Sequence, residues 1–372
     1  MISGRLNALR HSVPNLVVAQ RVLDKMAAAA SSYIADETGE AMVGLLVPGT
    51  HTNGIPTLYV LDTIAPDETA VRQLHTFQQG DERQDEMIWW LQENWRVGRE
   101  KRQSADRKPL ETKWDVPLRY LGDWHKQPGF MIQPSQGDLM TAKNWIADPT
   151  NGMDFLLAPI VTLGHPSASA GAAGANFVTV PQDDDTCMRV DFWYLDSHSR
   201  DFLPIAPTVY PNEQLPSLVA YPWHLVKEAR FNAEYGLLQK DGLLTSLVLW
   251  EASGELPLAV CLLTARLGWN RLLILVTPWN YPAAPPTARS APFVEMSPDD
   301  DIYAVFESVW KESEPVTDPP GWSWSEGRYL IDYIYALEAA LDIREKSPAG
   351  GGGESSSGEG AENGESSSED VL

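Results

Sequence analysis

The stretch from Leu121 to Pro128 and the segment after it carry the side chains with the clearest chemical pattern in this chain. His125 and Gln127 lie two residues apart, and Ser135 and Asp138 follow, so the pattern reads His-x-Gln-x7-Ser-x2-Asp. On an extended segment, residues two apart point to the same side. Asp138 stands at the start of the next predicted helix and can reach back to that point. We therefore expect His125, Gln127 and Asp138 to converge.

Such a convergence is typical of catalytic zinc, which has three protein ligands and leaves the fourth position open. The metal acidifies its bound water, and a nearby carboxylate takes the proton. The Ser135 hydroxyl could donate a hydrogen bond to the developing oxyanion. Gln127 departs from this chemistry, because a carboxamide binds zinc poorly in comparison with a neutral imidazole. Function therefore depends on position 127.

Three interpretations of Gln127 stay open at the level of sequence. In the first, the amide still binds the metal, weakly or through a water molecule. In the second, another histidine such as His51 or His75 replaces it. In the third, the site holds no metal and the domain only binds a partner. Simple structural roles also exist, since Ser135 can be a helix N-cap and Asp138 a favourable charge in the first helical turn.

The elements that must position these residues are predicted from apolar spacing and turn signals. In the first 200 residues, the pattern predicts helices over 16–31, 82–94 and 138–146, and strands over 41–47, 57–61, 118–122, 155–161 and 188–195. The charged, aperiodic segment from Arg96 to Lys113 is expected to be a mobile loop. Residues 1–200 are therefore expected to form one α/β domain.

A second domain is predicted over residues 222–345, after a proline-rich linker over 201–221. Its pattern predicts a helix over 225–239, strands over 243–250, 258–264 and 271–276, and terminal helices over 300–311 and 326–343. The prolines of Tyr281-Pro-Ala-Ala-Pro-Pro286 are expected to stop strand pairing after the third strand. Residues 346–372 are rich in Gly, Ser and Glu, so we expect a disordered acidic tail.

Composition excludes several classes of function. The net charge is −23 and basic residues form no dense cluster, so we expect no nucleic-acid binding, whereas a partner with a basic surface is compatible. No apolar run approaches the ~20 residues that cross a bilayer, and no signal peptide is evident, so a cytoplasmic protein is expected. Cys187 and Cys261 are far apart, which predicts two reduced core thiols.

Two separated motifs resemble the JAB/MPN (JAMM) zinc isopeptidases of the bacterial type. Residues 37–44, Glu-Thr-Gly-Glu-Ala-Met-Val-Gly, are similar to that family's Glu-Thr-Gly-Gly-(apolar)3-Gly stretch. Residues 121–128 resemble its Gly-Glu-Trp-His-x-His-Pro, with Gln127 in place of the second histidine, and residues 134–138 resemble its Pro-Ser-x-x-Asp. The similarity covers about residues 15–165. It implies a mixed β-sheet of the cytidine-deaminase-like kind, flanked by helices.

The same resemblance assigns roles to individual residues. It implies that Glu37 is the general base, that Ser135 steadies the oxyanion, and that His125 and Asp138 hold zinc together with whatever Gln127 contributes.

Residues 222–345 resemble the α+β ubiquitin-conjugating/RWD superfamily. The similarity rests on residues 230–238, on Tyr281-Pro-Ala-Ala-Pro-Pro286 and on Trp322 before the last helix. A conjugating enzyme needs a thiolate to carry its thioester. No cysteine follows Tyr281, and Cys261 falls inside a predicted strand, where burial is expected. This half is therefore expected to be a binding module, with Trp279, Trp322 and Trp324 as candidate contact residues.

Together the resemblances imply a zinc-dependent isopeptidase or peptidase that acts on ubiquitin-like proteins or their conjugates, impaired at Gln127. The alternative is a catalytically inactive scaffold that binds ubiquitin-like proteins and other proteins of a conjugation pathway. A small-molecule amidase is a third possibility.

Overall fold

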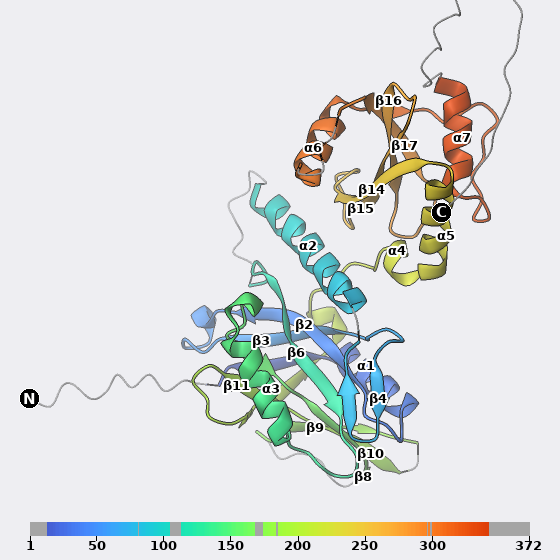
Figure 1. Cartoon of the computed structure of the whole chain (residues 1–372). Helices are drawn as coiled ribbons and strands as arrows, with labels where there is room; N and C mark the ends of the chain where they lie inside the picture. The colour runs from blue at the N-terminus through green and yellow to red at the C-terminus, as the bar shows by residue number, and fades with distance from the viewer. Residues whose placement is uncertain are drawn as a thin grey trace, which may run out of the picture.

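The structure is a computed structural model that describes residues 13–80, 82–104, 113–167, 174–183, 185–295, 297 and 300–341. It is a mixed α/β protein with 31% helix and 33% strand, which confirms the predicted class. A large mixed sheet fills the first half of the chain and a smaller antiparallel sheet the second (Figure 1). The predicted acidic tail over 346–372 lies outside the described residues.

The large sheet has the strand order β13-β1-β3-β2-β6-β8-β10-β9. Strand β1 runs parallel to β3 and β13, β6 runs parallel to β8, and the other neighbours are antiparallel. The bounds are β1 Asn15–Ala19, β2 Gly39–Val47, β3 Thr57–Ile64, β6 Leu118–Lys126, β8 Ile160–Pro166, β9 Phe177–Pro181, β10 Thr186–Asp191 and β13 Pro207–Tyr210.

Smaller elements attach to this sheet. Strands β7 (Phe155–Leu157), β11 (Trp193–Asp196) and β12 (Leu203–Pro204) form a three-stranded sheet, and β4 (Val71–Gln73) pairs with β5 (Thr76–Gln78). Short 3-10 turns, η1 Gly49–His51, η2 Pro149–Asn151 and η3 Asn212–Gln214, connect elements. The segment 201–221 is therefore not a free linker, because it contributes β12 and β13 to the sheets of the first half.

The first predicted helix begins later than expected. Residues 15–19 form strand β1, and helix α1 spans Gln20–Ser32. Buried Leu, Val and Ala side chains over 16–19 suit a strand with parallel neighbours on both sides, where both faces are covered. Helix α1 then packs its buried residues Val22, Leu23, Met26 and Ala30 on the sheet.

Helix α2 runs from Glu82 to Ser104, well beyond the predicted end at Asn94. Arg96 forms ion pairs with Glu93 and Glu100, three and four residues away on the same helix face. Such pairs stabilise a helix that lacks apolar periodicity. The prediction of a mobile loop was therefore wrong for 96–104, and residues 105–112 lie outside the described part.

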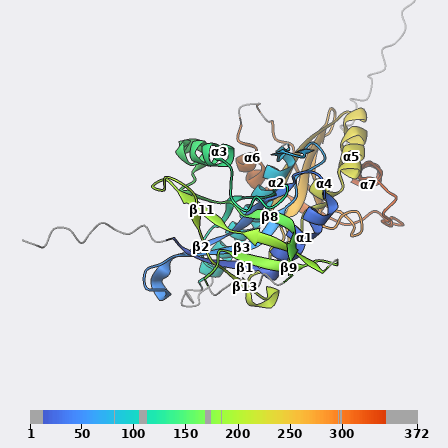
Figure 2. The same ribbon diagram turned by 90° about the horizontal axis from the view of Figure 1, so that it is seen from below.

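Helix α3 spans Gln136–Ala147 and packs on β7 and β11 through Leu139, Ala142, Leu156 and Leu195. Seen from below, it lies on the β11 side of the molecule, apart from α1 (Figure 2).

The second half is a sequential antiparallel sheet with helices around it. Its elements are α4 Trp223–Val226, α5 Glu228–Lys240, β14 Leu243–Trp250, β15 Ala259–Arg266, β16 Arg271–Thr277, β17 Thr287–Pro292, α6 Ile302–Glu312, β18 Glu314–Val316 and α7 Leu330–Leu341. Pairing does not stop after the third strand, because β17 starts directly after Pro286 and pairs with β16. The prolines occupy the turn and leave the following N–H groups free for the ladder.

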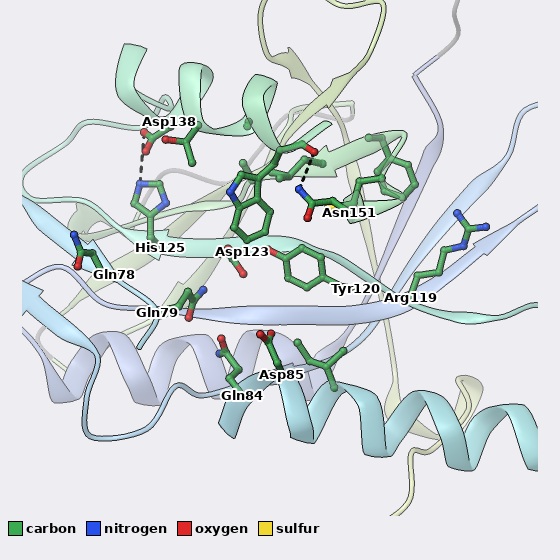
Figure 3. Close-up of a pocket in the computed structure, with 18 of the residues that line it drawn as sticks. Gln78, Gln79, Gln84, Asp85, Arg119, Tyr120, Asp123, His125, Asp138 and Asn151 are labelled. Atoms are coloured by element: carbon green, nitrogen blue, oxygen red, sulfur yellow. Dashed lines mark hydrogen bonds and ion pairs between the residues drawn. The ribbon is translucent and has the colours of Figure 1, made fainter. Parts of the chain in front are cut away.

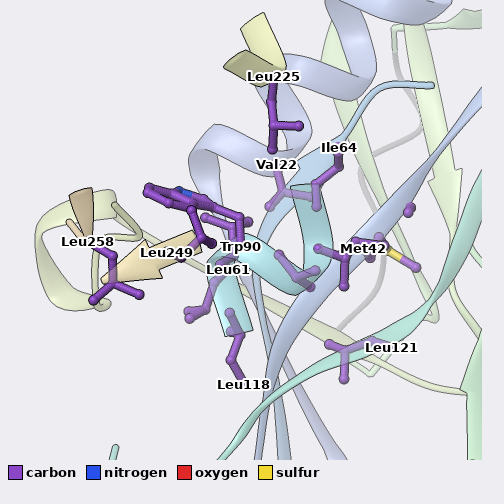
Figure 4. Packing of buried hydrophobic residues seen from close by; sticks show 14 of the residues in the cluster. Val22, Met42, Leu61, Ile64, Trp90, Leu118, Leu121, Leu225, Leu249 and Leu258 are labelled. Atoms are coloured by element: carbon purple, nitrogen blue, oxygen red, sulfur yellow. The ribbon is translucent and has the colours of Figure 1, made fainter. Parts of the chain in front are cut away.

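Helix α2 holds the two halves together. Trp90 packs in one cluster with Leu61 and Leu118 of the first half and with Leu249 and Leu258 of the second (Figure 4). The buried Asn94 side chain accepts a hydrogen bond of 2.8 Å from the Leu258 amide. No helix among the described residues is long and apolar enough to cross a membrane.

Candidate functional site

The two sequence motifs meet where strand β2 begins beside the end of strand β6. Gly39 lies opposite His125 in the antiparallel ladder, and the Thr38 carbonyl accepts a hydrogen bond of 2.6 Å from the Lys126 amide. A Cβ at Gly39 would lie 2.2 Å from the Trp124 carbonyl oxygen, so only glycine permits this approach. Glu37, two residues before Gly39, is thereby placed at the mouth of the site.

His125, Gln127 and Asp138 lie close together, as their spacing predicts. His125 Nε2 is 3.8 Å from Asp138 Oδ2 and 3.1 Å from the Gln127 amide. Their backbone is fixed by β8 and the segment before it, because the amides of His125 and Gln127 donate to the carbonyls of Pro159 and Val161.

The Gln127 amide is fixed by its surroundings. Its nitrogen donates to the carbonyls of Met131 at 2.6 Å and Gln133 at 3.1 Å, which leaves its oxygen to accept from His125 Nε2 at 3.1 Å. The opposite orientation would offer Asp138 a contact of only 3.5 Å and would turn the amide oxygen toward two carbonyl oxygens. The hydrogen-bond network therefore selects the first orientation, and it places a proton on His125 Nε2.

This arrangement does not fit a tight zinc site. Zinc needs a deprotonated imidazole nitrogen, whereas His125 Nε2 carries a proton and donates a hydrogen bond to the Gln127 oxygen. Within the described residues, no three His, Cys, Asp or Glu side chains are grouped so that they could hold a metal. His75 stands in the β4–β5 turn near enough to Glu37 to lower its pKa, but it does not complete such a group. His51 ends η1, and its side chain is outside the described part.

Ser135 and Asp138 form the N-terminal cap of α3. Ser135 Oγ accepts from the Asp138 amide at 3.2 Å, and Asp138 Oδ2 accepts from the Ser135 amide at 2.6 Å. The reciprocal pair is a capping box. Asp138 also lines the cleft described below, whereas Ser135 does not. The structure therefore gives Ser135 a structural role.

Glu37 and His125 line one cleft together with Asp138. Burial and the Asp138 carboxylate raise the pKa of Glu37, while His75 and Lys126 oppose them. Burial lowers the pKa of His125, and Asp138 only partly offsets this effect. His125 is therefore neutral at neutral pH, and Glu37 is a carboxylate that accepts a proton more readily than an exposed one.

The cleft is about 980 Å³ in volume and extends from these residues along β6 between α2 and α3. Gly122 has a φ of +126°, and the β2–β6 register shifts at this point. Because of this β-bulge, Tyr120 and Asp123 face the cleft together with His125, whereas Leu121 and Trp124 are buried in the core. Figure 3 shows Tyr120 and Asp123 with His125 on one side and Gln84 and Asp85 on the other.

Tyr120 and Asp123 were not expected at a functional site. Burial raises the pKa of Asp123 to about 6, with Tyr120 and Gln79 opposing the rise and Asp85 adding to it. For Asp123, the sequence signal is its spacing of two residues from His125. For Tyr120, it is Gly122, since a glycine inside a predicted strand often marks a bulge. Trp89 of α2 and Trp145 of α3 also line the cleft, with 46% and 41% of their surfaces exposed.

The second half offers no reactive thiol among its described residues. Cys261 is fully buried in β15, as predicted, and burial raises the pKa of its thiol to about 12. Cys187 is also buried and free. Of the candidate contact residues, Trp279 is 41% exposed, while Trp322 stacks on Tyr333 and Trp324 donates to the Pro282 carbonyl.

Comparison with known protein families and with curated proteins finds no match. Among solved structures, the solution structure of protein DSY2949 from Desulfitobacterium hafniense is similar at 12% identity and a TM-score of 0.27, covering 53% of this chain and 93% of that one. A likeness at this level carries no argument about function.

Proposed function

We propose that this chain is a metal-free, non-catalytic protein with a JAB/MPN-like first half and a ubiquitin-conjugating/RWD-like second half. It binds polypeptides of a ubiquitin-like conjugation system. The observation that carries the proposal is the hydrogen bond between Gln127 and His125, which occupies the nitrogen that a zinc ion would need. The ubiquitin-like partner follows from the two sequence resemblances.

Energetics favour this conclusion over a weakened zinc enzyme. The Gln127 nitrogen is held by two carbonyls in a buried position, so the amide oxygen is the only atom that Gln127 could offer a metal, and that oxygen already accepts a hydrogen bond from His125. Metal binding would also have to displace the proton of His125, and a carboxamide oxygen returns little ligand strength.

A zinc-dependent isopeptidase is the second candidate. It is favoured by the position of Glu37, whose carboxylate lines the same cleft as His125 and Asp138 and has a raised pKa. These are the properties of a general base. The two candidates differ in a measurable way, since only the second requires stoichiometric zinc.

The shape and lining of the cleft support a polypeptide as the bound partner. A volume of about 980 Å³ exceeds what a single side chain fills, and it is open to solvent beside two half-exposed tryptophans. Aromatic side chains of this kind are common anchors in protein interfaces.

Binding can be tested by filling the cleft. Thr141 is exposed on α3 and lines the cleft, whereas Asn144 is exposed on the same helix outside it. We expect Thr141→Phe to weaken binding of ubiquitin-like proteins about tenfold or more, and Asn144→Phe to leave it unchanged. Calorimetry with a panel of ubiquitin-like proteins, with chelator present throughout, measures this. The proposal is overturned if no ubiquitin-like protein of the panel binds. It is also overturned if, in a separate sample without chelator, added zinc leads to cleavage of the C-terminal tail of a ubiquitin-like protein.

A further inference from the structure

Four buried polar atoms at the floor of the cleft have no hydrogen-bond partner among the residues that the structure describes. They are both amide atoms of Gln79, the Tyr120 hydroxyl and Asp123 Oδ1. Tyr120 and Gln79 lie near enough to Asp123 to counter part of the effect of burial on its pKa, yet no hydrogen bond of normal geometry joins them. Figure 3 shows the three side chains gathered beside β6.

Such a cluster is costly for the folded state. Each unpartnered buried polar group destabilises a protein by about 1–3 kcal/mol, and native structures contain few of them. These three residues come from two separate segments, the end of the β4–β5 hairpin and strand β6, and they all line the same cleft. A ligand that reaches the floor would supply the missing partners.

The charge of the cleft selects the kind of ligand. The described lining residues carry one guanidinium, that of Arg119, and the neutral imidazole of His125. The same part of the lining carries five carboxylates, those of Glu37, Asp85, Asp123, Asp138 and Asp154. A cation in this cleft therefore gains Coulomb energy. An anion would be repelled.

The hydrogen-bonding capacity of the floor narrows the ligand further. Asp123 Oδ1, the Tyr120 oxygen and Gln79 Oε1 can all accept, and a guanidinium or ammonium group has only donors. Gln79 Nε2 needs an acceptor, which a peptide carbonyl next to the basic side chain provides. The aromatic ring of Trp145, 6.1 Å from that of Tyr120 between centroids, can cover the apolar stem of such a side chain.

We infer that the floor formed by Gln79, Tyr120 and Asp123 is a subsite for an arginine or lysine side chain of the polypeptide bound in the cleft. The inference rests on the proposed binding function and specifies it. It adds three residues that the zinc-site pattern does not contain, and it requires a basic residue in the bound segment of the partner.

The subsite is tested on the full chain with small probes. N-acetyl-arginine amide and N-acetyl-citrulline amide have nearly the same shape, but only the first is charged. We expect calorimetry or NMR titration to show that the arginine probe binds about tenfold tighter or better, because charge-assisted hydrogen bonds are about twice as strong as neutral ones. Equal affinity for the two probes would overturn the inference.

Variants separate the subsite from general charge. Asp123→Asn is expected to weaken arginine binding about tenfold, whereas Asp154→Asn, the same charge change at an exposed position of the cleft, should weaken it only about twofold. Equal losses would contradict a specific subsite. If Asp123→Asn fails to fold, Tyr120→Phe and Gln79→Ala provide the same comparison, and full arginine affinity in both would contradict it.

The same samples distinguish this inference from the proposed function. Stoichiometric zinc, or cleavage of a ubiquitin-like probe, overturns the proposed function whatever the arginine result is. Lack of arginine preference in a preparation that still binds a ubiquitin-like protein overturns only the subsite.

Discussion

Gln127 and Asp123 show which properties of single residues can be predicted from sequence. The convergence of His125, Gln127 and Asp138 follows from spacing, because residues two apart on a strand share a face. The orientation of the Gln127 amide could not be predicted, since it depends on the carbonyls of Met131 and Gln133 in an irregular loop. Asp123 shares the face of His125 by the same two-residue rule, whereas Tyr120 joins them only because the bulge at Gly122 reverses the alternation that period-two reasoning assumes.

His224 gives a prediction about pH at the same scale. Its ring lies among those of Trp90, Trp223 and Phe231, and its Nδ1 has no hydrogen-bond partner within the described part of the chain. Burial lowers the pKa of His224 from 6.5 to about 4. The unfolded chain therefore takes up a proton near pH 6.5, which the folded chain resists until about pH 4. Neutral His224 therefore stabilises the folded state above pH 6.5, and this stabilisation is lost as the pH falls from 6.5 to about 4.

The size of that loss can be measured by denaturant unfolding of the wild type and of His224→Gln. Between pH 7 and pH 4.5, we expect the wild type to lose about 2 kcal/mol more than the variant, because a pKa shift of one unit corresponds to about 1.4 kcal/mol. An identical pH dependence in the two proteins would contradict this assignment.

At the scale of elements, α2 and α3 differ in how they could be predicted. The start of α3 at Gln136 follows from Ser135 and Asp138, which form a recognisable cap. The end of α2 at Ser104 could not be predicted from apolar periodicity, because charge pairs around Arg96 continue the helix. Strand β13 was missed because prolines suggested a linker, although an edge position in the sheet tolerates them.

The cap of α3 provides a test at this scale. Ser135→Ala removes the acceptor of the Asp138 amide and should lower the free energy of unfolding by about 1 kcal/mol. Gln136→Ala, one residue later on the exposed surface, is the control and should change it little. If the two variants are equally stable, the hydroxyl does not cap the helix.

At the scale of the whole molecule, one hydrophobic cluster extends across both halves through α2. Sequence patterns predicted two domains of α/β character, but not their contact, because Trp90 and Asn94 meet residues more than a hundred positions away. The contact fixes how the cleft of the first half lies relative to the second half. It also makes the two halves interdependent in stability.

Asn94 is the residue that tests this interdependence. Asn94→Leu keeps the side-chain volume roughly but leaves the buried Leu258 amide without an acceptor, which should cost about 1–3 kcal/mol. Thermal unfolding should then show a lower midpoint or two separated transitions. Glu86→Ala, on an exposed face of the same helix, should behave like the wild type. A wild-type melting curve for Asn94→Leu would show that this contact does not couple the halves.

The zinc content of purified full-length protein tests the central claim most directly. Wild type, Gln127→His and Gln127→His/His125→Ala are incubated with zinc, desalted and analysed by mass spectrometry of the metal. The account predicts no stoichiometric zinc in the wild type, about one zinc per chain in Gln127→His, where the second imidazole completes three ligands, and its loss in the double variant. One zinc per wild-type chain, removed by His125→Ala alone, would contradict it.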